Sequence, residues 1–380
     1  MHPIYLDHAA TTPVAEPVLA AMLPYFSETF GNPSAIHRWG QRAWQALQQA
    51  RKQVAALLHC APGELIFTGS GSEGANLAIR GIAIAAQQAG KGNHIVLGPL
   101  EHQAVSQTIA QLQRVHGFDV TVLPVDSTGL VAPADFAAAL RPDTVLASVA
   151  YANNEVGTIQ PLAELGRIAR AHAVPLHTDA VQAASQLALD VQTLNVDALS
   201  LAAHKFYGPK GVGALYLRQG VTLLPQQMGG SQEQNRRAGT ENVPLIVGLA
   251  AALQLAVERR AADVAHYTLL RDRLIAGILA ACPDCQLTGH PQQRLPNHAS
   301  FACRNISGNE LLLRLDVAGI AASSGSACSV GNPSPSKVLQ AMGLRAPWDS
   351  GGLRLTVGRA NTPPEIDQTI RVLQHICQPD

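Results

Sequence analysis

The fold is decided by one stretch of sequence, Ala198-Leu-Ser-Leu-Ala-Ala-His204-Lys205-Phe-Tyr-Gly208-Pro-Lys210-Gly211. Its apolar first half predicts a buried strand, and ligand sites of α/β proteins lie at the carboxyl ends of such strands. His204 and Lys205 fall at that end, where the glycines beyond them let the backbone turn tightly. A lysine held there can be desolvated and act as a Schiff-base nucleophile, although a lone lysine after a strand is more often a surface residue. Lys210, between proline and glycine, is predicted to be such a turn lysine.

Apolar strands alternate with longer helices through the first two thirds of the chain. The predicted strands are Glu64–Thr68, His94–Gly98, Asp119–Pro124, Thr144–Tyr151, Pro175–Thr178, Ala198–Ala202 and Gly213–Leu217. The predicted helices between them include Ser34–Leu58, Gly71–Ala89, Gln103–His116 and Leu162–His172. This alternation predicts an α/β fold whose large domain holds a mostly parallel seven-stranded sheet covered on both faces.

The pattern changes after Asn242. One or two long helices are predicted over Val243–Ala281, followed by shorter elements. These are the strands Ala299–Cys303 and Leu353–Val357 and the helices Gly308–Ala318 and Pro364–Cys377. We therefore expect a large domain over residues 16–255 and a smaller α+β domain over residues 256–380, to which residues 1–15 return.

Composition excludes several classes of function. The 380 residues carry 27 Lys+Arg and 27 Asp+Glu, so there is no excess of basic charge to displace counterions from nucleic acid. No run of ~18 apolar residues could span a bilayer and no signal segment opens the chain, so we expect a cytoplasmic protein. The six cysteines are too scattered for a disulfide-built fold, and we expect them to be reduced.

Two other strand ends point to pyridoxal phosphate (PLP). PLP chemistry needs a lysine and an acid that faces the pyridinium nitrogen, and the strand before Asp179 supplies a carboxylate. By itself Asp179 is as well explained as a helix N-cap. Gln182 is placed to reach the ring hydroxyl if the chain turns helical there. The run Thr68-Gly-Ser-Gly-Ser-Glu-Gly74 follows a strand and opens a helix, so its N–H groups can hold a phosphate.

Together these motifs resemble the NifS/IscS-type cysteine desulfurases, in the class V aminotransferase group of fold type I PLP enzymes. The matching segments are Ile4–Pro13, Gly31–Pro33, Glu101-His102, Asn153–Gly157, Asp179–Gln182, His204-Lys205, Arg237–Asn242, Ser323–Cys328 and Leu353–Arg359. They span nearly the whole chain in the family's order. The resemblance implies an enzyme that removes sulfur from L-cysteine and releases L-alanine. The sulfur stays on the enzyme as a cysteine persulfide, for transfer to iron–sulfur cluster or other thio-cofactor biosynthesis.

The resemblance also implies roles for individual residues. Lys205 would bind PLP covalently and move the substrate Cα proton, His102 would stack on the ring, and Cys328 would accept the sulfur. The other implied cofactor-binding residues are Gly71, Ser72, Asn154, Asp179, Gln182, His204 and Thr240, the last from the neighbouring subunit. Asn154 and Arg354 would hold the substrate carboxylate. The resemblance further implies a homodimer and a sulfur-acceptor protein, of which an iron–sulfur scaffold is one candidate.

Two positions bear on the resemblance in opposite ways: Cys328 supports it, and Ala202 departs from the family's pattern. Cys328 lies in a serine- and glycine-rich loop, Ser323–Pro335, of the kind expected to be exposed and flexible. The family commonly has a phosphate-binding serine two positions before the His-Lys pair, and here that position is Ala202. One hydrogen bond to the phosphate is therefore expected to be lost or replaced.

Three other kinds of protein fit this sequence less well. A selenocysteine lyase or an aminotransferase would use the same cofactor, but the cysteine loop favours desulfuration. A non-catalytic scaffold is disfavoured because Lys205, Asp179 and His102 are all present. No metal site is predicted: Cys282-Pro-Asp-Cys285 has metal-ligand spacing but no second pair, so a loop after a helix is the better interpretation. Cys60, Cys303 and Cys377 are predicted to be structural.

Overall fold

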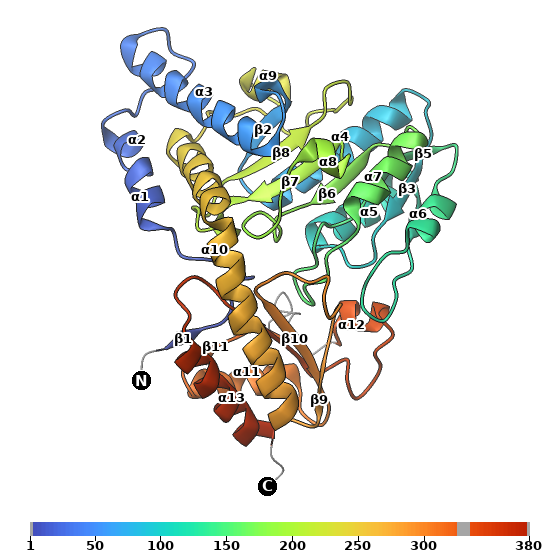
Figure 1. Cartoon of the computed structure of the whole chain (residues 1–380). Helices are drawn as coiled ribbons and strands as arrows, with labels where there is room; N and C mark the ends of the chain where they lie inside the picture. Colours follow the sequence, from blue (N-terminus) through green and yellow to red (C-terminus); the bar gives the residue numbers. More distant parts are fainter. Residues whose placement is uncertain (1–2, 325–334, 378–380) are drawn as a thin grey trace.

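The computed structural model describes residues 3–324 and 335–377, and its upper part in Figure 1 is built on a seven-stranded sheet. The strands are β2 (Leu65–Thr68), β3 (His94–Leu97), β4 (Asp119–Val122), β5 (Thr144–Ser148), β6 (Leu176–Asp179), β7 (Ala198–Ala202) and β8 (Gly213–Leu217). Their order is β2-β8-β7-β6-β5-β3-β4. Only β8 runs antiparallel to its neighbours in this sheet. The predicted mostly parallel sheet is confirmed.

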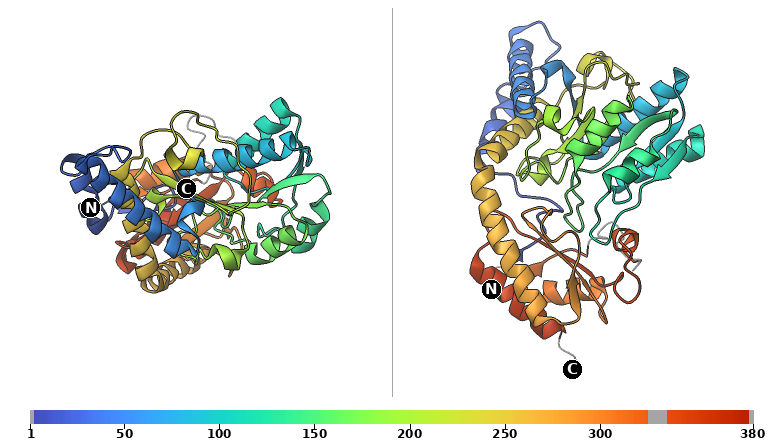
Figure 2. Two further views of the ribbon diagram at one scale, coloured as in Figure 1. Left: turned by 90° about the horizontal axis from the view of Figure 1, so that it is seen from above. Right: turned by 45° about the vertical axis from the view of Figure 1, so that its right-hand side comes forward.

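Both faces of this sheet are buried. Successive side chains of a strand point to opposite faces, so one strand can contribute to two cores. On β2, Leu65 and Phe67 join one hydrophobic core and Ile66 joins the other. One face is covered by α4 (Gly71–Gln88) and α5 (Gln103–His116), and the opposite face by α3 (Arg38–Leu58), α7 (Leu162–Ala171) and α8 (Val191–Leu194). The resulting helix–sheet–helix layers are seen from above in Figure 2.

Most predicted boundaries lie within two residues of those in the structure, and two differ by more. The helix predicted from Ser34 begins at Arg38, because the extended His37 caps it by accepting a hydrogen bond from the Gly40 N–H (3.2 Å). β5 ends before the predicted Tyr151, although the N–H of Tyr151 still donates to the Asp179 carbonyl of β6 (2.9 Å). The short helices α1 (Glu16–Met22), α2 (Pro24–Ser27), α6 (Pro133–Ala139) and α9 (Gln232–Asn235) were not predicted.

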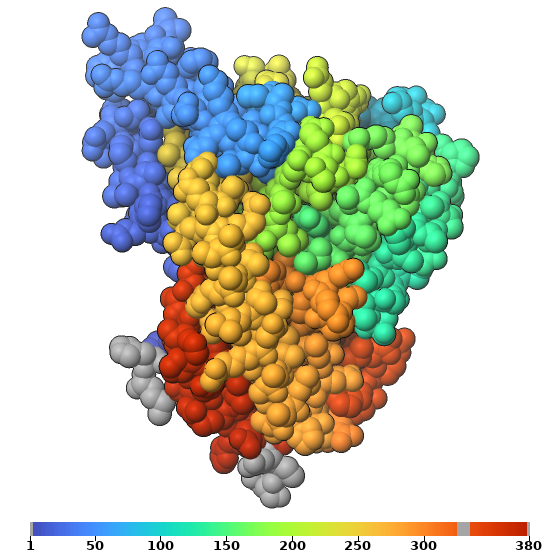
Figure 3. Space-filling model, in the orientation of Figure 1, coloured from blue at the N-terminus to red at the C-terminus, as the bar shows by residue number. Residues whose placement is uncertain are grey.

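A single 39-residue helix, α10 (Val243–Ala281), runs from the large sheet to the lower part of the molecule. It packs on α3 and α1 near its start and on α13 (Pro363–Cys377) near its end. In the space-filling view of Figure 3 it lies across both parts on the surface. Of the helices in the described ranges, none combines the length and apolar composition that crossing a membrane requires.

The lower part has its own antiparallel sheet and hydrophobic core. β9 (Cys285–Leu287), β10 (His298–Cys303) and β12 (Gly352–Thr356) form a three-stranded sheet in the order β12-β10-β9. The N-terminal strand β1 (Ile4–Tyr5) pairs in parallel with β11 (Ile320–Ala321). The helices α11 (Gly308–Val317), α12 (Lys337–Ala341) and α13 complete this part. The domain boundary at residues 255 and 256 stays a prediction.

The prediction of reduced thiols is wrong for Cys285 and Cys303, which form a disulfide. Cys285 opens β9, a strand that was not predicted, and the antiparallel register places it directly opposite Cys303. Their Cα atoms are 4.1 Å apart, as expected for a pair without mutual backbone hydrogen bonds, in which side chains approach closely. The pairing depends on this register, so the spacing of the cysteines in the sequence did not reveal it.

Candidate active site

A cavity of about 340 Å³ lies at the carboxyl ends of β6 and β7. Among the residues lining it are Gly71, Ser72, His102, Asn154, Asp179, Gln182, His204, Lys205 and Arg354. These are the predicted site residues except two. Thr240 lines a separate depression with Tyr25 and Asn32, and Cys328 lies outside the described residues.

Lys205 reaches the cavity from a 3₁₀ turn, Ala203–Lys205, which directly follows β7. Its Nζ donates to the carbonyl oxygens of Ala9 (2.5 Å) and Ala10 (2.8 Å). The Ala9 carbonyl also accepts a hydrogen bond from Gln182 Nε2 (2.9 Å). The N-terminal segment therefore forms one wall of the cavity and holds the lysine amine inside it. The sequence did not predict that this segment lines the cavity, although Ala9 and Ala10 lie in the matching segment Ile4–Pro13.

Asp179 ends β6 and directs its carboxylate into the same cavity. Its Oδ1 accepts a hydrogen bond from the Val181 N–H (2.9 Å), so it closes a turn, and no helix follows for it to cap. Burial raises the pKa of Asp179, and the positive charges of His102 and Lys205 oppose that rise. A cationic nitrogen in the cavity would offset the same burial cost.

The glycine-rich run forms the first turn of α4, and its side chains are tied back by hydrogen bonds. Ser70 caps the helix by accepting from the Glu73 N–H (3.0 Å), while Glu73 accepts from the Gly69 N–H (2.7 Å) and from Arg237 Nε (2.7 Å). The N–H groups of Gly71 and Ser72 lie in the first turn, where a helix offers them no acceptor. This turn can therefore bind an anion from the cavity.

Gly71 is required at this turn by close packing. A Cβ at this position would lie 2.9 Å from Val181 Cγ2 and 3.2 Å from the Cβ of Ala202. Ala202 thus faces the first turn of α4, and both residues line the cavity. The alanine that replaces the family's usual serine is next to the predicted phosphate site.

The two histidines of the site have different environments. His204 Nδ1 lies 3.2 Å from Thr11 Oγ1, and burial, with Lys205 and Lys210 nearby, lowers its pKa to about 4. His204 is therefore neutral at pH 7. His102 caps α5, because its Nδ1 accepts from the Ala104 N–H (3.1 Å). This bond leaves Nε2 as the ring nitrogen that can exchange a proton in the cavity.

Arg354 comes from β12, so the cavity uses residues of the seven-stranded and the three-stranded sheets. Its side chain is buried, with Nη1 donating to the Asn154 carbonyl (2.8 Å) and Nη2 to Asp7 Oδ1 (2.7 Å). Arg354 Nε is buried without a hydrogen-bond partner among the described residues. The predicted pair Asn154 and Arg354 is in contact, but through the backbone of Asn154. The unpaired Nε suits an anionic ligand, since a buried donor gains from an acceptor.

Two buried glutamates near the site were not predicted. Glu101 accepts a hydrogen bond from the Ala150 N–H (2.5 Å), and its burial raises the pKa of its carboxyl well above the usual range. Burial also raises the pKa of Glu155 to about 7, opposed by the Ser336 hydroxyl that donates to it and by Arg354. Both glutamates lie in family motifs, but burial of a carboxyl is not visible in a motif.

A lysine and a carboxylate at adjacent strand ends, with an anion-binding helix turn beside them, define an α/β enzyme of fold type I. Residues 4–369 match the aminotransferase class-V family model. The chain is 48% identical over 375 residues to "Cysteine desulfurase IscS" of Methanosarcina thermophila, which covers 99% of this chain and 92% of that protein. It is 44% identical over 377 residues to "Cysteine desulfurase IscS" of Clostridium botulinum, with 99% and 94% covered.

Solved structures agree with this assignment. A NifS-like protein superposes with a TM-score of 0.92 at 35% identity, covering 98% of this chain and 99% of its own. A structure of SspA in complex with cysteine has a TM-score of 0.82 at 34% identity, with 94% and 100% covered. The chain belongs to the aminotransferase class-V family and, within it, to the NifS/IscS-type cysteine desulfurases.

Proposed function

We propose that the chain uses PLP to take sulfur from L-cysteine, releases L-alanine and keeps the sulfur as a persulfide on Cys328. The observation that carries this proposal is the cavity in which Lys205, Asp179 and Arg354 converge. The names of the relatives, and the cysteine bound to SspA in one related structure, support the choice of substrate. We also propose a cytoplasmic location, a homodimer and a separate sulfur-acceptor protein.

The residues present fit PLP. The first turn of α4 leaves the N–H groups of Gly71 and Ser72 for a phosphate, and a Cβ at Gly71 would collide with Val181. Asp179 would pair with the pyridine nitrogen, and Gln182 would contact the ring oxygen. His204, neutral at pH 7, would donate to the phosphate, and Thr240, outside the cavity, would reach the phosphate of a second copy. When bound, PLP supplies an electron sink for negative charge at the substrate Cα.

The residues of this chain then bind the substrate and move protons. Arg354 and Asn154 hold the carboxylate. The buried Arg354 Nε has no hydrogen-bond partner among the described residues, so its N–H can donate to the carboxylate. Lys205 Nζ, held by the Ala9 and Ala10 carbonyls, takes the proton from Cα and later returns one. His102 exchanges a proton through Nε2, because its Nδ1 is occupied by the helix cap.

Cys328 receives the sulfur. Its thiolate attacks the substrate sulfur, a sulfur–sulfur bond forms, and the carbon–sulfur bond breaks with its electron pair left on the carbon skeleton. Protonation of that skeleton gives L-alanine, so no external oxidant is needed. The support for Cys328 is its serine- and glycine-rich sequence, since the residue lies outside the described ranges.

The test is turnover of L-cysteine by the holoenzyme in the presence of a thiol reductant. Alanine and sulfide should form in equal amounts. Lys205→Ala should lose the bound cofactor's visible absorbance, whereas the control Lys210→Ala, at an exposed turn, should keep it. Cys328→Ala should keep the absorbance and lose turnover. Full turnover by Cys328→Ala with cysteine would favour lyase chemistry of the kind expected for selenocysteine, and dependence on a 2-oxo acid would favour an aminotransferase.

A further inference from the structure

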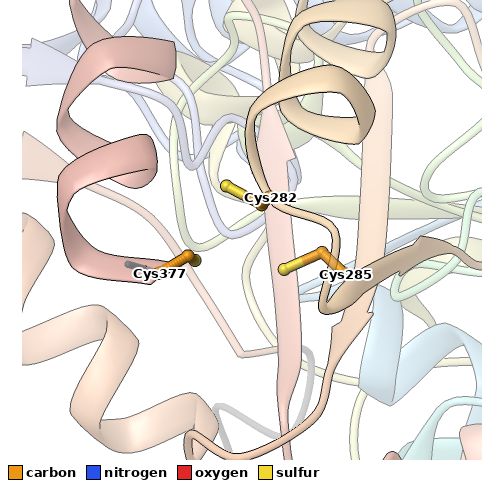
Figure 4. Close-up of side chains that lie close together, drawn as sticks. All are labelled: Cys282, Cys285 and Cys377. Carbon is orange, nitrogen blue, oxygen red and sulfur yellow. The ribbon is translucent and has the colours of Figure 1, made fainter. Parts of the chain in front are cut away.

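Four cysteines meet at the end of the lower part, away from the active-site cavity. Cys282 follows the last residue of α10, Cys285 opens β9, Cys303 ends β10 and Cys377 ends α13. Figure 4 shows the side chains of Cys282, Cys285 and Cys377 directed toward one another. Their Sγ atoms all lie within 4.8 Å of one another, and Cys303 is bonded to Cys285. None of the four lines the active-site cavity.

The fold brings two further cysteines, Cys303 and Cys377, to the Cys282-Pro-Asp-Cys285 segment, which has no second pair near it in the sequence. The Cys285 N–H donates to the Cys282 carbonyl (3.0 Å), which closes the tight turn of a C-x₂-C segment. Strand pairing brings Cys303 to Cys285, and the packing of α13 on α10 brings Cys377 to Cys282. Structural zinc sites likewise combine a C-x₂-C segment with two further ligands from elsewhere in the chain.

The sulfurs are already close to the spacing that a tetrahedral ion requires. With Zn–S bonds of about 2.3 Å, tetrahedral sulfurs lie about 3.8 Å apart. The Sγ atoms of Cys282, Cys285 and Cys377 lie within 4.8 Å of one another and therefore need shifts of about 1 Å or less, whereas Cys303 Sγ must move away from Cys285 Sγ, to which it is bonded in the disulfide. Cys282 is fully buried and Cys377 half-buried, so the ion would be shielded from water on most sides.

We propose that Cys282, Cys285, Cys303 and Cys377 form a thiolate site for one zinc-class ion, which becomes available when a dithiol reductant cleaves the Cys285–Cys303 disulfide. The reductant gives two electrons and two protons and becomes a disulfide itself, while Cys285 and Cys303 become thiols. The ion then binds four sulfurs and displaces their protons. Soft thiolate ligands select Zn²⁺ over Mg²⁺ or Ca²⁺.

A bound cation would favour the thiolate form of the cysteines, because metal binding displaces their protons. Without an ion, the hydrogen bond to Cys377 and burial raise the pKa of Cys282, whereas the hydrogen bond from Cys282 and the positive charge of Arg314 lower the pKa of Cys377. Asp284 opposes them, but its carboxylate accepts a hydrogen bond from Arg304 Nε (2.5 Å), which offsets its charge. The bound ion would join the ends of α10 and α13 to the edge of the small sheet, and metal binding would thus stabilise this part of the fold.

Cobalt is a suitable probe, because tetrahedral cobalt thiolates have visible bands at longer wavelengths than a bound PLP. The reduced, oxygen-free holoenzyme should show these bands with one equivalent of Co²⁺ and lose them when Zn²⁺ is added. Cys377→Ser and Cys282→Ser should abolish the bands. The matched control Cys60→Ser removes a free thiol elsewhere in the fold and should keep them.

Two outcomes would overturn the four-cysteine site, and a third would overturn its dependence on reduction. One is cobalt binding that survives Cys377→Ser, since the ion would then be held by Cys328 or by histidines. The other is the absence of thiolate bands in the reduced wild-type protein, which needs no variant to interpret. The disulfide form is the remaining control: it should bind no cobalt at this cluster, and equal binding before and after reduction would contradict the redox dependence.

Discussion

Replacing Ala202 by serine should add a hydrogen bond at the proposed phosphate site. Ala202 ends β7, is 3% exposed and faces Gly71 at the first turn of α4. A hydroxyl at this position would extend into the cavity beside the N–H groups proposed to bind the phosphate. The substitution adds one oxygen at the cavity wall, which Ala202 lines.

The expected gain follows from the charge of the phosphate. A hydrogen bond to a charged group contributes about 1.5–3 kcal/mol, which corresponds to a 10- to 150-fold lower Kd for PLP. Equilibrium dialysis of the apo-protein against PLP measures this change. Pyridoxal, which lacks the phosphate, is the matched ligand, and its affinity should not change.

Ala203→Ser is the matched variant. Ala203 is fully buried and packs against Gly208, so a hydroxyl there should lower stability without tightening PLP binding. An unchanged Kd for PLP in a folded Ala202→Ser protein would refute the placement of the phosphate at α4. Equal tightening of PLP and pyridoxal would refute it as well.

Two further predictions concern Arg354 and Glu155. Arg354→Lys removes the planar fork and the unpaired Nε, so kcat/KM for L-cysteine should fall about 10- to 100-fold, and steady-state kinetics showing no loss would contradict carboxylate binding by this residue. Burial raises the pKa of Glu155 from 4.5 to about 7, so the folded state binds more protons than the unfolded state between these values and stability falls as pH rises through this window. Glu155→Gln should remove up to about 3 kcal/mol of this pH-dependent decrease in the free energy of unfolding. Urea unfolding at pH 5 and pH 8 measures it, and an unchanged pH dependence would show that the carboxyl is not the cause.

The elements that local sequence determines were predicted well. β7 and β8 have the predicted bounds, because continuously apolar strands between turn residues have few alternatives. Lys205 and Asp179 fall at the ends of neighbouring strands, so their convergence followed from sheet topology. The short helices and two-residue strands were missed, since they carry too few residues for a periodic pattern.

What depends on contacts between distant segments was not predictable. The Cys285–Cys303 disulfide requires the register of a three-residue strand, and the burial of Glu101 and Glu155 requires the packed site around them. The capping of α3 by His37 shortened a helix that composition alone would extend. The resemblance assigns Thr240 to the phosphate site of a neighbouring subunit. A single chain therefore does not place Thr240 in its own cavity.

The most direct test of the proposed function is the location of the sulfur after one turnover. The holoenzyme is treated with L-cysteine without a reductant, digested, and its cysteine peptides are mapped by mass spectrometry. We expect the added mass of one sulfur atom on the peptide containing Cys328, and none on the peptide containing Cys60. Sulfur on another cysteine, or alanine formed with no sulfur on Cys328, would contradict the persulfide mechanism.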